Sequence, residues 1–304
     1  MTRARALAEY LPIAAFAWVA HLLPRRWALS LGRGTGLLAF VLSRSRKGVA
    51  LKNLEAAFGH ELGAEERHRI ARDVFAHFGG VAIECLLMRW RRPADIDALV
   101  DYEGLEHLKK AFLMGKGVFV VSGHYGNWEI VSLMQGWVGY PMAMVTRPMD
   151  NPFLERHLAR GRRASGHTII SKHNAARGIL KALRHGWCVA LLIDQDTRSR
   201  DHLFVDFFGR PAATTSALGL LALRSGAPIV PVFGVPLPRG RYKITYLPEV
   251  SLPKTGDREA DATAITREVT RLIEKEVRAR PEYWAWMHQR WKTRPRHGMQ
   301  EQRA

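Results

Sequence analysis

The chain has 304 residues, enough for one large α/β domain or two small ones, and its 47% apolar and 24% charged residues exclude a disordered chain. Its 46 Lys and Arg residues against 28 Asp and Glu residues give a formal net charge of +18, which predicts an anionic partner: nucleic acid, an acidic membrane surface, or an acidic protein or ligand. Cys85 and Cys188 lie far apart and near no His/Cys cluster, so we expect small core residues in a reducing compartment rather than a disulfide or metal site.

The first predicted element is a membrane anchor at residues 1–26. Residues 6–23 read ALAEYLPIAAFAWVAHLL between flanking arginines, and a run of about 18 residues is the short end of what can span a bilayer. A glutamate, a proline and a histidine within the run weaken a spanning helix, and no small-residue cleavage site of a signal peptide follows. We expect either a marginal span or a helix in the interface with Tyr10 and Trp18 near the headgroups; an ordinary buried first helix is the alternative.

Residues 27–304 are expected to form a single α/β domain. Two helical stretches come first, residues 27–58 and 64–91, the second with acids in its first turn as a helix N-terminus prefers. After Asp101, short apolar runs alternate with helical stretches. The runs expected as strands are residues 117–123, 141–146, 167–170, 188–194, 227–235 and 242–247, and the expected helices are residues 153–164, 174–185 and 214–225. The pattern predicts a mostly parallel mixed sheet covered by helices on both faces.

Candidate catalytic residues follow the first of these strands. Ligands of such sheets bind beyond the carboxyl ends of the strands, where His124 is followed five residues later by Glu129. Residues i and i+5 of a helix lie about 140° apart, so two glycines and Asn127 must form a turn that brings the pair together. A carboxylate that accepts from one imidazole nitrogen leaves the other free as a general base. The alternative is a satisfied loop histidine and a surface glutamate.

Six blocks of sequence follow one another in order over nearly the whole chain. They read VVSGHYGNWE, VTRPMDNP, LLIDQDTR, FVDFFGRPAATTSA, PIVPVFG and PEYWAWMHQRWKTRP. Together they resemble the bacterial lipid A secondary acyltransferases, the lauroyl/myristoyl enzymes within the wider glycerolipid acyltransferase superfamily. The resemblance implies an acyltransferase-type fold with an N-terminal anchoring helix and transfer of an acyl chain from acyl carrier protein to a hydroxyl of a lipid A precursor. It also implies that His124 is the general base and Glu129 its orienting partner, with no cofactor and no covalent enzyme intermediate.

The resemblance further implies a set of substrate-binding residues. Arg147 would hold phosphate or the developing thioester oxyanion, and Arg198 would be a second phosphate contact. Arg198 ends a variant of the superfamily's Glu-Gly-Thr-Arg block, with Gln-Asp in place of Gly. The remaining candidates are Asn127, Asp194, Phe207, Phe208, Gly209 and Arg210, of which the phenylalanines and the glycine would line the acyl groove and Arg210 would lie near the head group. A solvated strand-end arginine is the alternative for Arg147, and core packing is the alternative for the phenylalanines. Asp194 and Asp196 have no third ligand at suitable spacing, so no metal site is expected.

The C-terminal block carries Trp284, Trp286 and Trp291 among basic residues. This composition suits a membrane interface or an anionic lipid, and it would equally suit a single-stranded nucleic-acid platform. Packing in the core is the third interpretation.

Three classes of function remain open. The first is a lipid A acyltransferase on the cytoplasmic face of a bacterial inner membrane, with acyl carrier protein as donor, a membrane lipid as acceptor and an anionic surface beneath it. The second changes the acceptor to a lysophospholipid, an ornithine lipid or a phosphatidylinositol glycolipid, with acyl-CoA or acyl carrier protein as donor. The third is a basic nucleic-acid-binding protein, but the chain has no helix-turn-helix, zinc or RNA-recognition motif, so no nucleic acid is expected as a partner. Acyl chain length depends on where an apolar tunnel closes and is not predicted.

Overall fold

The computed structural model describes residues 2–295, except residues 92–94, 96, 138, 165, 172–174 and 199–201. Residue 174, the first of a predicted helix, therefore lies outside the described residues.

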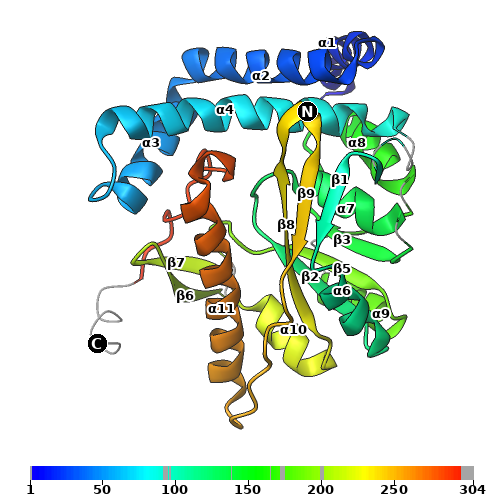
Figure 1. The fold of residues 1–304 in the computed structure, drawn as a ribbon, viewed down its shortest axis with the longest axis vertical. Coiled ribbons are helices and arrows are strands. Elements are labelled where there is room, and N and C mark those ends of the chain that lie inside the picture. Colours follow the sequence, from blue (N-terminus) through cyan, green and yellow to red (C-terminus); the bar gives the residue numbers. More distant parts are fainter. Residues whose placement is uncertain are drawn as a thin grey trace.

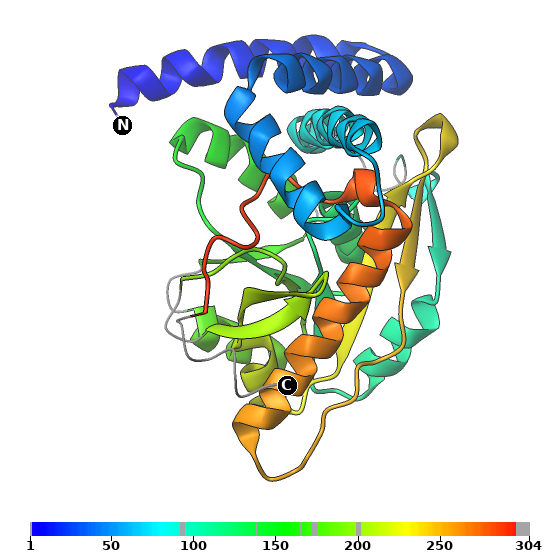
Figure 2. The same cartoon turned by 90° about the vertical axis from the view of Figure 1, so that its left-hand side faces the viewer.

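Four helices from the first third of the chain form a layer across one end of the molecule (Figures 1 and 2). They are α1 (Arg3–Leu22), α2 (Arg25–Leu42), α3 (Arg44–Phe58) and α4 (Ala64–Leu87), followed by the 3-10 helix η1 (Met88–Trp90). The single helix predicted over residues 27–58 is two helices, because the backbone leaves helical geometry at Ser43 (φ −89°, ψ 79°). Among the residues that the structure describes, no helix is long and apolar enough to cross a bilayer.

Glycines allow α2 and α4 to pack backbone against backbone. A Cβ atom on Gly36 would overlap the carbonyl oxygen of Phe75, and one on Gly79 would overlap the carbonyl oxygen of Gly32. Any larger residue at these positions would push the two helices apart. This close packing fixes α2 on α4, which itself lies against the end of the sheet (Figure 1).

The centre of the domain is a seven-stranded sheet in the order β1-β9-β8-β2-β5-β3-β4. The strands are β1 (Val100–Glu103), β2 (Val118–Ser122), β3 (Met142–Thr146), β4 (Thr168–Ser171), β5 (Cys188–Leu192), β8 (Ile229–Pro236) and β9 (Tyr242–Tyr246). Neighbouring strands are parallel except for the antiparallel pair β8 and β9. The predicted mostly parallel mixed sheet is confirmed. The edge strand β1 was not predicted, because its short sequence VDYE carries two acids and no apolar run.

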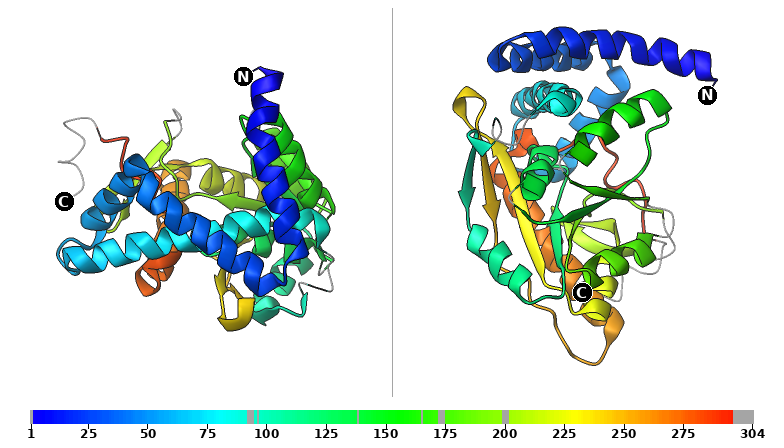
Figure 3. Two further views of the ribbon diagram at one scale, coloured as in Figure 1. Left: turned by 90° about the horizontal axis from the view of Figure 1, so that it is seen from above. Right: turned by 90° about the vertical axis from the view of Figure 1, so that its right-hand side faces the viewer.

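Helices cover both faces of the sheet, as predicted, because successive strand residues point to opposite faces. Val118 and Val120 of β2 pack with α6 (Leu105–Leu113) and α7 (Trp128–Trp137), whereas Phe119 and Val121 pack with α9 (Ala175–Arg184), α10 (Ala217–Ser225) and α11 (Arg258–Ala279). Figure 2 shows α6 and α11 on opposite sides of the strands. The remaining helix α8 (Pro152–Ala164) lies below α1, at the same end as the N-terminal layer (Figure 3), and it also contacts η1.

Two further elements were not predicted. The segment expected as a substrate loop is a hairpin of β6 (His202–Phe207) and β7 (Arg210–Thr215), so the helix predicted from residue 214 begins at Ala217. The long helix α11 is capped by Asp257, whose carboxylate accepts the backbone N–H groups of Glu259 and Ala260, both at 3.0 Å. Such a cap satisfies donors that the first helical turn leaves unpaired.

Two short 3-10 helices, η2 (Pro238–Gly240) and η3 (Pro281–Tyr283), complete the described elements. The chain from the last residue of η3 onward, residues 283–295, runs back across the carboxyl ends of the strands and is called the C-terminal strap below.

Candidate active site

The loop between β2 and α7, residues 123–127, is clamped from two sides. The N–H of Gly126 donates to the carbonyl oxygen of Tyr283 at 2.9 Å, and the N–H of Asn127 donates to that of Gly234 at 2.8 Å. Gly126 has a φ of +58°, and a Cβ atom there would overlap the Gly234 carbonyl oxygen, so this turn requires glycine. The loop is therefore held rigidly at the carboxyl end of the sheet, where catalytic residues are expected.

The register of the sheet brings His124 beside Asp194. Ser122 of β2 pairs with Leu192 of the parallel neighbour β5, and His124 and Asp194 each follow that pair by two residues. Asp194 Oδ1 lies 2.7 Å from His124 Nδ1, and its Oδ2 accepts the backbone N–H of His124 at 2.6 Å. Asp194 therefore holds both the ring and the backbone of the histidine.

This pair perturbs the pKa of both groups. Burial by itself lowers the pKa of His124, but the Asp194 carboxylate, its hydrogen bond and the more distant Glu129 carboxylate outweigh burial and raise the pKa above its ordinary value. Burial would raise the pKa of Asp194, but the charge of His124 and the hydrogen bonds from His124 and Trp284 lower it to about 2. Asp194 therefore stays ionised and stabilises the imidazolium that a proton transfer would form.

The second ring nitrogen of His124 faces the open side of the site. Because the carboxylate of Asp194 only accepts, Nδ1 carries the proton of the neutral ring and Nε2 is an acceptor. The side-chain amide nitrogen of Gln195 lies 3.1 Å from Nε2 and donates to it. The ring of Trp128 packs edge-on against the imidazole, and the His124 side chain is 23% exposed. Nε2 is thus the basic atom that a substrate hydroxyl can reach.

Glu129 pairs with a different residue from the predicted one. It lies in the first turn of α7, and both of its oxygens accept from Arg162 of α8, Oε1 from Nη2 at 2.5 Å and Oε2 from Nε at 3.2 Å. Burial lowers the pKa of Arg162, but the Glu129 charge and hydrogen bonds raise it overall. The structure thus differs from the predicted pairing, since Asp194 and not Glu129 holds Nδ1 of His124. That Glu129 takes part in catalysis stays a prediction.

Asn127 is a structural residue and not an exposed substrate contact. Its side chain is fully buried. Oδ1 accepts the N–H of Ile130 at 3.1 Å and so caps α7, while Nδ2 donates to Glu84 at 2.7 Å. Glu84 is also bonded to Tyr242 and ion-paired with Arg25 of α2. Asn127 therefore connects the loop of His124 to the N-terminal helical layer.

The C-terminal strap closes the site from the side of β5. The indole N–H of Trp284 donates to Asp194 Oδ2 at 2.7 Å, and the N–H of Ala285 donates to the carbonyl oxygen of His124 at 3.1 Å. Trp284 and Trp286 are 1% and 0% exposed, so these two tryptophans are core residues, not parts of a membrane interface. Trp291 is partly buried and packs against the ring of Phe207.

Two further side chains, Asn53 and Arg290, anchor the strap. Asn53 of α3 donates to the carbonyl oxygens of Trp286 and His288 at 2.8 and 2.6 Å. Arg290, fully buried, donates to Ala213 and Thr214 of β7 at 2.7 and 2.6 Å. The anchors join the N-terminal layer, the hairpin and the loop of His124 into one unit.

The two predicted phosphate contacts are both exposed. Arg147 follows β3, and its Nη2 lies 3.4 Å from Oδ1 of Asp150, which is itself exposed. Arg198 ends the segment that begins at Asp194, next to residues outside the described part of the chain. Each is oriented to solvent at the carboxyl end of the sheet, and its contact with phosphate stays a prediction.

The phenylalanines predicted to line the acyl groove lie in the core. Phe207 is fully buried, packs against Trp284 and has the guanidinium of Arg290 over its ring. Phe208 is buried between Phe58 and Trp286. Gly209, at a φ of +69°, completes the tight turn of the hairpin, and Arg210 is exposed. Core packing, the alternative interpretation, therefore describes both rings.

Sequence reasoning missed the roles of Asp194, Gln195, Arg162 and Trp284. The one available signal was that Asp194 follows a strand end as His124 does. The sequence does not show that β5 is the direct neighbour of β2 or which residues pair, and this register decides the contact. No residue pattern marked Arg162 or Trp284, which lie 33 and 90 residues from their carboxylate partners.

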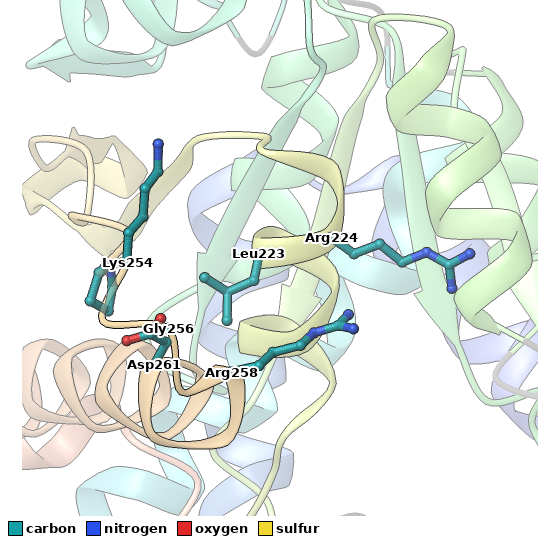
Figure 4. Close-up of a pocket in the computed structure, with 7 residues that line it drawn as sticks. Leu223, Arg224, Lys254, Gly256, Arg258 and Asp261 are labelled. Atoms are coloured by element: carbon teal, nitrogen blue, oxygen red, sulfur yellow. The ribbon is translucent and has the colours of Figure 1, made fainter.

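Of two hollows among the described residues, one lies near the carboxyl end of the sheet and the other lies far from it. A cavity of about 20 Å³ between α7 and the sheet is lined by Trp128, Ser132 and Gln135, and it has room for about one water molecule. A surface hollow of about 480 Å³, lined by Arg224, Lys254 and Arg258, lies at the amino ends of the parallel strands (Figure 4). Neither is large enough and near enough to His124 to serve as an acyl tunnel. Among the described residues, no group of three His, Cys, Asp or Glu side chains could hold a metal ion.

Comparison with known proteins identifies the family. The family described as Bacterial lipid A biosynthesis acyltransferase matches residues 2–293. The lipid A biosynthesis palmitoleoyltransferase of Escherichia coli K12 is 31% identical over 280 residues, 91% of this chain and 89% of that protein, and the lauroyltransferase of the same organism is 29% identical over the same lengths. The crystal structure of the 1-acyl-sn-glycerophosphate acyltransferase PlsC from Thermotoga maritima covers 84% of this chain and 99% of that chain at 15% identity, with a TM-score of 0.37, too low to support an argument. The chain is an acyltransferase that belongs to the bacterial lipid A biosynthesis acyltransferase family.

Proposed function

We propose that this protein adds a secondary acyl chain to a lipid A precursor, with acyl carrier protein as the donor. The observation that carries the proposal is the His124–Asp194 pair at the carboxyl end of the sheet, in a chain that matches the family over residues 2–293. Related proteins are named as palmitoleoyl-, lauroyl- and myristoyltransferases of lipid A biosynthesis, which supports the same class of acceptor.

In the proposed mechanism the acceptor hydroxyl takes the place of the Gln195 amide at His124 Nε2. Nε2 removes the hydroxyl proton while the oxygen attacks the thioester carbonyl carbon, and Asp194 stabilises the imidazolium. When the tetrahedral intermediate collapses, the C–S bond breaks and the imidazolium returns the proton to the leaving sulfur. General base catalysis of this kind contributes about 10²–10⁴-fold. No serine or cysteine nucleophile is required.

The Glu129–Arg162 pair supplies the second part of the proposed site. The Glu129 carboxylate raises the pKa of His124 through space, and Arg162 forms an ion pair with that carboxylate. Arg147 and Arg198 are exposed at the same end of the sheet and are proposed to bind lipid phosphates.

The N-terminal layer is proposed to lie on the cytoplasmic face of a bacterial inner membrane. α1 and α2 carry exposed large apolar side chains, and Trp18 and Trp27 are each 57% exposed. Arg3, Arg5 and Arg26 are exposed beside them, as expected for a helix that binds an anionic lipid surface. We call the exposed surface of α1 and α2 that carries Trp18 and Trp27 the apolar face. A donor protein that is strongly acidic would be attracted by the +18 charge of the chain.

The test is to mix detergent-solubilised enzyme with a tetra-acylated lipid A precursor and acyl carrier protein loaded with a range of chains, and to weigh the lipid by mass spectrometry. We expect one added acyl mass with wild type and none with His124→Ala, which should keep the fold. Acylation of a lysophospholipid or an ornithine lipid instead, in a parallel reaction with acyl-CoA, would keep the chemistry and change the acceptor. Retained transfer in His124→Ala would contradict the general-base role.

A further inference from the structure

Asp194 has two carboxylate oxygens, and the two are held by different parts of the molecule. Oδ1 faces His124 Nδ1 at 2.7 Å. Oδ2 accepts the backbone N–H of His124 at 2.6 Å and the indole N–H of Trp284 at 2.7 Å. Asp194 is 3% exposed, so its carboxylate is shielded from bulk solvent. Trp284 is therefore the side chain, other than His124 itself, that fixes the rotation of this carboxylate.

The geometry points to a role for Trp284 as a positioning residue: its indole N–H fixes Oδ2 of Asp194 so that Oδ1 stays directed at His124. This inference rests on the proposed function, because it assigns Trp284 to the same proton transfer.

The position of Trp284 is set by the C-terminal strap and not by the sheet. Trp284 forms an antiparallel bridge with Tyr125, and its ring packs against Phe207 of the hairpin at 5.3 Å. Arg290 and Asn53 anchor the strap on either side. The indole thus reaches Asp194 from a segment 90 residues away along the chain, with little freedom to move.

Loss of this donor should affect the pH dependence as well as the rate. Without this donor the carboxylate can turn so that Oδ1 leaves Nδ1, which stabilises the imidazolium less and lowers the pKa of His124. A residue that only fills the core would change stability without moving that pKa.

The neighbouring Trp286 offers a matched control. It is fully buried, lies at 4.6 Å from Trp284 between ring centroids, and donates its indole N–H at 2.7 Å, but to the carbonyl oxygen of Pro281. Trp284→Phe and Trp286→Phe each remove one indole N–H hydrogen bond from the same core. Only the bond removed by Trp284→Phe goes to Asp194.

The experiment measures kcat, KM and the pH profile of acyl transfer from acyl carrier protein in both variants, with thermal unfolding as the check on folding. Trp284→Phe is expected to lower kcat about 10–100-fold, the range for a hydrogen bond to a charged group, with KM within about twofold, and to move the acid limb of kcat/KM to lower pH. Trp286→Phe is expected to lower the unfolding temperature but to keep kcat within about threefold and the limb in place.

If Trp284→Phe does not fold, 3-benzothienylalanine at position 284 keeps the shape of the ring and removes the N–H. Equal kcat values and equal acid limbs in the folded 284 and 286 variants would overturn the inference. Failure of the proposed function would look different, because wild type and both variants would then all lack transfer to the lipid A precursor.

Discussion

The two sides of His124 are built differently, although each presents a buried carboxylate. On the side of β5 and the strap, Asp194 accepts three hydrogen bonds, two from His124 and one from Trp284. On the side of α7 and α8, Glu129 is bonded to Arg162 through both oxygens. Asp194 thus bonds directly to the histidine, whereas Glu129 forms an ion pair with an arginine. Nearness in sequence did not decide the partner: five residues separate His124 from Glu129, and seventy separate it from Asp194.

The largest expected effect is that of Asp194→Asn. The amide oxygen of Asn would remain at the Oδ2 position, where His124 N–H and Trp284 Nε1–H donate, and the amide N–H₂ would then face Nδ1. Nδ1 must become an acceptor, so the proton of the neutral ring moves to Nε2 and the base is lost. We expect kcat/KM to fall about 10³–10⁴-fold, measured by product mass, with the fold unchanged by circular dichroism. A loss under about tenfold would mean that Asp194 is not the partner that matters.

A smaller effect is expected from substitutions in the Glu129–Arg162 pair, on the other side of His124. Glu129→Gln leaves Arg162 buried without its anion, and Arg162→Gln leaves Glu129 buried without its cation, so each should lower kcat about 10–100-fold and reduce stability. The double variant should be less impaired than the product of the single losses, because it removes both charges. If Glu129 instead orients His124 directly, Glu129→Gln would match the loss of Asp194→Asn and Arg162→Gln would behave almost like wild type. The four rates therefore separate the two carboxylates.

The smallest effect on chemistry is expected in the apolar face, which touches neither side of His124. Replacing Trp18 and Trp27 together by Gln should weaken binding to vesicles of anionic phospholipid about tenfold or more, because each removes exposed apolar area that would be buried in the interface. Transfer in detergent micelles should stay within about twofold. Leu113→Gln is the matched control, since Leu113 is 85% exposed at the end of α6, away from α1 and α2. Equal vesicle binding by wild type, the double tryptophan variant and Leu113→Gln would contradict a membrane role for this face.

Periodicity predicted the elements better than their contacts. The strands that consist of apolar runs, such as β2 and β5, begin and end within one or two residues of the predicted bounds. The hairpin of β6 and β7 was missed because its sequence FVDFFGRPAATT shows no regular alternation of polar and apolar residues and resembled a known substrate block. Phe207 and Phe208 show the same limit, since an apolar residue near a site has the same sequence character in a groove as in the core.

In the candidate site, too, the sequence predicted the position of a residue better than its contacts. His124 was found from its place after a strand, and the structure puts it at the carboxyl end of the sheet as expected. Its partner depended on the register between β2 and β5, which one sequence does not reveal, and the bond from Trp284 depended on how the strap returns across the sheet. Side chains that meet across long stretches of chain need the three-dimensional structure.

The most direct test of the His124–Asp194 account is the pH profile of kcat/KM for acyl transfer in wild type, Asp194→Asn and Glu129→Gln. The base must be neutral, so the rate rises with pH through the pKa of His124, and Asp194 raises that pKa above the ordinary value of about 6.5. We predict an acid limb above pH about 6.5 in wild type, a shift to lower pH with a greatly reduced plateau in Asp194→Asn, and only a small shift in Glu129→Gln. A limb that stays in place in Asp194→Asn and moves down in Glu129→Gln would contradict the account and assign the histidine to Glu129.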